Sequence, residues 1–148
     1  MKEEDKKLLL KDLCARLPYG VKAQVKYPIN ANGEYIITTK EITSVNCGLD
    51  MVQAENIDII VGYYIFEVKP YLFPLSSMTD YQEEELKNIY YSFNGMFQYT
   101  ERIFDKIPFG KMKYFPYQIE EFFNKNHIDY RGLIPKGLAI DATNKNIY

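Results

Sequence analysis

His127 and Asp129 are the one place in the sequence where an imidazole lies two residues from a carboxylate. Histidine suits acid–base catalysis near neutral pH, because its ordinary pKa is about 6.5. A small hydrolase or transferase that uses His127 and Asp129 is therefore one hypothesis. In the structural alternative, His127 ends a helix and Asp129 caps the next turn, since aspartate is a preferred N-cap residue. We favour the structural alternative and assign no catalytic residue.

Metal and nucleotide chemistry lack their usual sequence patterns. The chain has one histidine and neither CxxC nor HxxxH, the spacings typical of zinc sites. The glycine patterns that cradle phosphates, GxxxxGK[ST] and GxGxxG, are also missing from the sequence. We therefore expect no metal and no cofactor.

The two cysteines, Cys14 and Cys47, are too few for a disulfide framework in 148 residues. Free cysteine is among the most buried residue types. The sequence therefore predicts two reduced, buried thiols. A nucleophile made from either cysteine and His127 depends on a proximity that spacing cannot supply.

Lys22 and Lys26, with Gln24 between them, occupy the polar positions of an alternating strand, and Lys40 is expected nearby. Small barrels bind single-stranded nucleic acid through such faces. The formal charge of −2, from 18 Lys+Arg against 20 Asp+Glu, excludes a globally basic nucleic-acid coat. Nucleic-acid binding through Lys22, Lys26 and Lys40 is therefore the alternative function.

The sequence is rich in aromatic residues, with 14 tyrosines and 9 phenylalanines. Tyrosine is enriched at protein interfaces, and 14 are too many to bury with bonded hydroxyls in one small core. An AT-rich genome is the alternative source of this excess. As candidate protein-binding residues we select Tyr71, Phe73, Tyr130 and Arg131. The competing interpretation is that the crossing at residues 69–74 packs a β unit against helices.

These residues must be positioned by an α+β chain. Residues 1–18 are predicted to be helical, because Leu10, Leu13, Cys14 and Leu17 form one apolar stripe. Short alternating segments in residues 19–75 predict a small antiparallel β unit, an SH3-like or OB-like barrel. Its strands are expected at residues 21–27, 34–45, 56–61 and 64–68.

The helical half is expected at residues 76–148, packed on the β unit. Thr79-Asp80-Tyr81-Gln82 fits a capping box that starts one helix, and another begins near Pro116. A short strand is expected at residues 138–141. Because no polar or Gly/Ser-rich linker separates the halves, residues 1–148 are interpreted as a single domain.

A membrane location is not expected. The longest apolar run, Ile59 to Phe66, has eight residues, whereas a membrane span needs about 20. The first residues carry no extended apolar segment of the kind that signal peptides contain. We expect a cytoplasmic protein without a membrane partner.

Three motifs carry a resemblance: residues 11–21 (KDLCARLPYGV), residues 68–79 (VKPYLFPLSSMT) and residues 123–141 (FNKNHIDYRGLIPKGLAID). Together they resemble small proteins from gut Bacteroides-type bacteria, their phages and integrated elements, a group with no assigned activity. The resemblance therefore implies a phage or mobile-element origin and no mechanism. Our leading hypothesis is a non-enzymatic module that binds another protein.

Overall fold

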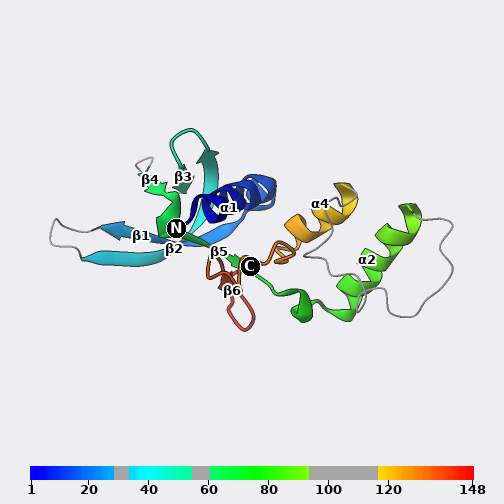
Figure 1. Ribbon diagram of the computed structural model, residues 1–148. Helices are drawn as coiled ribbons and strands as arrows, with labels where there is room; N and C mark the ends of the chain where they lie inside the picture. The colour runs from blue at the N-terminus through cyan, green and yellow to red at the C-terminus, as the bar shows by residue number, and fades with distance from the viewer. Residues whose placement is uncertain (29–33, 55–60, 94–116) are drawn as a thin grey trace.

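A computed structural model of the chain has a six-stranded, mostly antiparallel sheet with the N-terminal helix against it, and the C-terminal helices lie on the far side of that helix (Figure 1). The structure describes residues 1–28, 34–54, 61–93 and 117–148. The helices are α1 (Glu3–Arg16), α2 (Asp80–Phe93) and α4 (Tyr117–Lys125). The strands are β1 (Lys22–Pro28), β2 (Tyr35–Asn46), β3 (Met51–Ala54), β4 (Val61–Tyr64), β5 (Val68–Leu72) and β6 (Ile140–Asp141).

The sheet is open, and this corrects the expected barrel. The strand order is β4-β3-β2-β1-β5-β6, with β4 and β6 at the two edges. β6 comes from the last part of the chain and pairs in parallel with β5. The sheet does not close, because β4 and β6 lie at opposite edges and are not paired with each other. The α+β class, the N-terminal helix and the C-terminal helices are confirmed.

Two apolar clusters form the core. In the first, α1 lies on one face of the sheet, where Leu9 and Leu13 pack against strand residues such as Val25, Val52 and Leu72. In the second, Leu86 of α2 packs with Phe122 and Phe123 of α4. The interpretation of residues 1–148 as one domain stays a prediction.

The buried face of α1 agrees with the predicted stripe except at Cys14. Leu10 and Leu13 are buried and Leu17 packs against the core, whereas Cys14 is exposed. The buried face also contains the charged residues Asp12 and Arg16. Cys47 is exposed as well, so the prediction of two buried thiols is wrong.

The strands that follow β2 are shifted from the predicted ones. Residues 56–60 of the expected third strand lie outside the described residues, and the structure has β3 and β4 on either side of them. The expected fourth strand, residues 64–68, contains a 3-10 turn at Ile65–Glu67 and only the first residue of β5. The turn forms because the Glu67 carboxylate accepts the Tyr64 N–H at 3.2 Å and so starts it. No helix in the described residues is long and apolar enough to cross a membrane.

Candidate functional site

The outer ends of β1 and β2 form a two-stranded ribbon, which we define as Lys26–Pro28 and Tyr35–Ile37. β5 pairs with β1 only over Ala23–Val25, and the β2–β3 pairing begins only at Ile42. Beyond these positions the two strands pair with each other alone, as Lys26 with Ile37 and Pro28 with Tyr35. The ribbon therefore projects from the sheet, as the labelled β1–β2 hairpin in Figure 1 shows.

The ribbon carries three consecutive exposed apolar residues. Tyr35, Ile36 and Ile37 have exposed fractions of 55%, 50% and 56%. Because successive strand side chains point to opposite faces, both faces of the ribbon present apolar surface. Sequence reasoning missed this surface. The available signal was the break in alternation at Tyr-Ile-Ile, since three adjacent strand residues cannot all face one core.

Of the four candidate protein-binding residues, Tyr71 and Tyr130 are buried and Phe73 and Arg131 are half-buried. Tyr71 and Tyr130 have exposed fractions of only 7% and 4%. Tyr71 Oη lies 3.2 Å from Thr39 Oγ1 on β2. The half-buried Phe73 pairs through its backbone with the segment after α4, accepting the N–H of Asp129 at 2.7 Å. They therefore offer little surface to a partner. The contacts of Tyr71 and Phe73 agree with the competing interpretation, in which residues 69–74 pack the β unit against the helical half.

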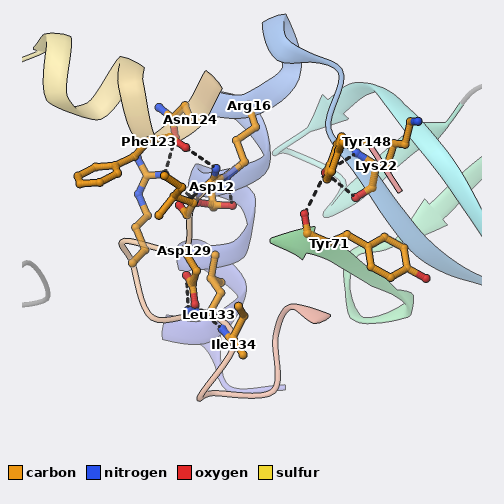
Figure 2. A network of polar contacts seen from close by, with 12 residues as sticks. Asp12, Arg16, Lys22, Tyr71, Phe123, Asn124, Asp129, Leu133, Ile134 and Tyr148 are labelled. Atoms are coloured by element: carbon orange, nitrogen blue, oxygen red, sulfur yellow. Dashed lines mark hydrogen bonds and ion pairs between the residues drawn. The ribbon is translucent and has the colours of Figure 1, made fainter. Parts of the chain in front are cut away.

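Arg131 belongs to a buried polar network centred on Asp12. Figure 2 shows Asp12 and Arg16 of this network. Arg16 Nε donates to Asp12 Oδ2 at 2.8 Å, and Arg131 Nη1 donates to Asp12 Oδ1 at 2.8 Å. Arg16 also donates to the carbonyl oxygens of Phe123 at 3.1 Å and Ile128 at 2.8 Å. The guanidinium of Arg16 is fully buried. This network joins α1 to the segment that follows α4, and its role is structural.

Asp129 caps the turn that follows it. Its Oδ1 accepts the N–H of Leu133 at 2.8 Å, and its Oδ2 accepts the N–H of Ile134 at 2.7 Å (Figure 2). Both carboxylate oxygens are therefore engaged with backbone amides. The side chain performs the capping role that the structural alternative assigned to it.

His127 is buried at the end of α4, with a left-handed backbone at φ 53°. Its ring stacks on Tyr148 with centroids 3.9 Å apart. Burial, helped by the positive charge of Arg16, lowers the pKa of His127 to about 4, so the ring is neutral at pH 7. Its Nδ1 has no hydrogen-bond partner in the described part of the chain.

The structure does not assemble a catalytic pair from these groups. His127 contributes a stacking ring, while both Asp129 oxygens accept backbone amides. Cys14 Sγ and Cys47 Sγ lie 3.8 Å from each other. Within residues 1–28, 34–54, 61–93 and 117–148, no group of three or more His, Cys, Asp or Glu side chains could hold a metal ion.

The lysine face is only partly as predicted. Lys22 and Lys26 lie on the sheet face turned away from α1, because Ala23 and Val25 between them are buried in the core. Lys40 is directly opposite Ala23 and so belongs to the other face, which corrects its expected place beside Lys22 and Lys26.

Lys69 lies on the same face as Lys22 and Lys26, whereas Lys22 is already hydrogen-bonded to the C-terminal segment. Lys69 of β5 is paired with Gln24, so it lies on the same side as Lys22. Lys22 Nζ donates to the Ile147 carbonyl oxygen at 2.7 Å, and Glu41 is directly opposite Lys22. The face is therefore a mixed polar surface with Lys26 and Lys69 exposed.

Tyr148 connects the end of the tail to this sheet. Its hydroxyl accepts the Lys22 N–H at 3.1 Å and donates to the Tyr71 carbonyl oxygen at 2.9 Å (Figure 2). Burial raises the pKa of Tyr148 to about 12, so the hydroxyl stays protonated and can donate.

No family model, curated protein or solved structure matches this chain.

Proposed function

We propose that the chain is a non-enzymatic protein-binding module whose docking element is the ribbon. The observation that carries the proposal is the exposure of Tyr35, Ile36 and Ile37 on both ribbon faces. Adjacent exposed apolar side chains mark interaction surfaces, and an isolated two-stranded hairpin is stabilised by packing against other structure. A phage or mobile-element origin, supported by the three sequence motifs, and action in the cytoplasm, supported by the short apolar runs of the sequence, are further parts of the proposal.

The charges beside the ribbon indicate the chemistry of the partner. Lys26 is exposed and lies opposite Ile37, and Lys69 is exposed farther along the same face. A protein with an apolar groove bordered by Asp or Glu side chains would cover Ile37 and pair with Lys26. In such an interface the apolar side chains supply most of the affinity, and the cations orient the encounter.

Affinity capture with matched variants tests the proposal. The tagged chain, the double variant Ile36→Ser/Ile37→Ser and the control Leu49→Ser/Tyr81→Ser are incubated with nuclease-treated and untreated lysate of cells that carry the gene. The control removes exposed apolar side chains outside the ribbon. We expect a stoichiometric protein partner that survives nuclease, is retained by the control and is lost with the ribbon variant. Equal capture by both variants, or no stoichiometric partner, would refute the proposal.

Affinity measurements on the captured partner give the quantitative version. The Kd for the ribbon variant is expected to rise by about tenfold or more, because central apolar contacts dominate interface energetics. The control variant should change Kd by less than about twofold, as peripheral positions do. The Lys26→Ala variant should mainly lower the association rate and weaken its dependence on salt.

The lysine face supports a second candidate, nucleic-acid binding. The specific observation is that Lys69 joins Lys22 and Lys26 on one sheet face. Neutralising about three phosphates gives a slope of log K against log salt of about −2 for single strands. Captured material that disappears after nuclease treatment, and is lost from a Lys26→Ala/Lys69→Ala variant, would favour this candidate over the protein-binding module.

A further inference from the structure

Cys14 and Cys47 are exposed cysteines from different elements of the fold, and their thiols lie close together. Cys14 lies on α1 and Cys47 in the turn between β2 and β3, and their Sγ atoms are 3.8 Å apart although the residues are 33 positions apart in sequence. Neither the ribbon nor the Asp12 network uses them. A disulfide has its sulfur atoms about 2.05 Å apart, so bond formation needs an approach of less than roughly 2 Å.

The proximity of the two thiols is imposed by anchored elements. In the turn, Asn46 Oδ1 accepts the N–H groups of Gly48 and Leu49, each at 3.1 Å, which holds the backbone around Cys47. At the end of the turn, Asp50 Oδ2 accepts a hydrogen bond from Lys6 Nζ of α1 at 2.8 Å. The turn is therefore tied to α1, the helix that carries Cys14. The tie is at Lys6, about two helical turns before Cys14.

We propose that Cys14 and Cys47 form a redox modification site that closes to an intramolecular disulfide by exchange with a low-molecular-weight disulfide. One cysteine thiolate attacks the small disulfide, forms a mixed disulfide and releases one small thiolate. The second cysteine thiolate then attacks the protein sulfur, forms the Cys14–Cys47 bond and releases the second small thiolate. The two protons of the cysteine thiols pass through solvent to the released thiolates. The protein is oxidised by two electrons, and the small disulfide is reduced to two thiols.

The crosslink would join α1 covalently to the β2–β3 turn. It would close a long loop that spans β1 and β2, so it should stabilise the fold and be reversed by a reductant. Burial and the neighbouring Cys47 thiol raise the pKa of Cys14, and exchange should therefore quicken as the pH rises from neutral, since the thiolate is the attacking species.

Oxidation of the purified chain by glutathione disulfide tests the site. After reduction and desalting, the native wild-type chain should lose two hydrogen atoms by intact mass, lose both free thiols and remain monomeric. Peptide mapping should identify the Cys14–Cys47 crosslink, and the melting temperature should rise by roughly 10 °C. Cys14→Ser and Cys47→Ser should each stop at a single glutathione adduct.

The same reaction in denaturing urea is the proximity control. Closure from the mixed disulfide should be at least about tenfold slower there, because the fold no longer holds the thiols together. Stable glutathione adducts on both cysteines of the native chain, intermolecular dimers alone, or closure equally fast in urea would overturn the proposal. Unchanged free thiols after incubation would also overturn it.

Discussion

Arg131 and Asp12 are 119 positions apart in the sequence, and Arg131 Nη1 donates to Asp12 Oδ1 over 2.8 Å. The same buried carboxylate also receives Arg16, from the next turn of α1. Two guanidinium groups therefore converge on one carboxylate at the junction between α1 and the segment after α4. These two segments are therefore joined by a buried ion-pair network as well as by apolar packing.

Removing Asp12 should destabilise the fold strongly. Asp12→Ala leaves the fully buried Arg16 guanidinium without its anion, and breaking a buried pair in this way costs about 3–5 kcal/mol. Urea unfolding followed by circular dichroism measures the change in the free energy of unfolding. The control is Asp5→Ala, which removes the Asp5–Lys136 ion pair between similar segments and should cost less than about 1 kcal/mol. Equal effects of the two substitutions would contradict the structural role of the network.

Substitutions of Asp129 should lower the free energy of unfolding in a graded way. Asp129→Ala removes the acceptor for the Leu133 and Ile134 amides and should cost about 2–4 kcal/mol, because two N–H groups lose a charged partner. Asp129→Asn keeps one oxygen acceptor and should lie between alanine and the wild type. Hydrogen exchange at these two amides gives the local readout. Amides that stay fully protected in the alanine variant would rule out the capping role.

The pH dependence of stability should carry the signature of His127. Its pKa is about 4 in the folded chain and near 6.5 in the unfolded chain. Between these values the unfolded chain binds the extra proton, so stability is complete above about pH 6.5 and is lost as the pH falls toward 4. The total loss from this group should be roughly 3 kcal/mol.

His127→Asn isolates that contribution. Asparagine tolerates the left-handed backbone at this position and does not titrate. The difference in free energy of unfolding between wild type and variant should therefore shrink as the pH falls from 7 to 4. A difference that is constant across this interval would show that His127 titrates normally in the folded chain.

The start of α2 offers a test at a position identified from sequence. Gln82 N–H donates to Thr79 Oγ1 at 3.2 Å, and the Thr79 N–H donates to Gln82 Oε1 at 3.0 Å, which confirms the predicted capping box. Thr79→Ala should cost about 1 kcal/mol, and Thr79→Ser should cost much less because it keeps the hydroxyl. Thermal unfolding compares the two variants. An equal loss of stability in both would point to the threonine methyl group instead of the cap.

Local patterns were sufficient for several elements because their causes lie within a few residues. Alternation predicted a strand at residues 21–27, and β1 spans Lys22–Pro28. The capping box predicted the start of α2, and Asp80 is its first residue. The α+β order of helix, strands and helices follows from such short-range signals. The interpretation of Asp129 as a cap belongs to the same group, since its bonded amides are four and five residues away.

Contacts between distant segments decided the rest. The sequence shows Asp12 and Arg16 as an ordinary helical pair, and only the carbonyl oxygens of Phe123 and Ile128 explain why Arg16 is buried. Cys14 is exposed although Leu10 and Leu13 of the same predicted stripe are buried. The projection of the ribbon from the sheet depends on where β5 and β3 stop pairing with β1 and β2.

Composition, periodicity and capping thus determined the class of the fold and the bounds of its better-patterned elements, because propensity and alternation act along the chain. Tertiary structure decided which faces are covered, that the sheet stays open with β4 and β6 at its edges, and that Cys14 meets Cys47. The physical reason is that burial and pairing depend on which segments meet in space, and neighbouring residues in the sequence carry no record of partners more than 30 positions away.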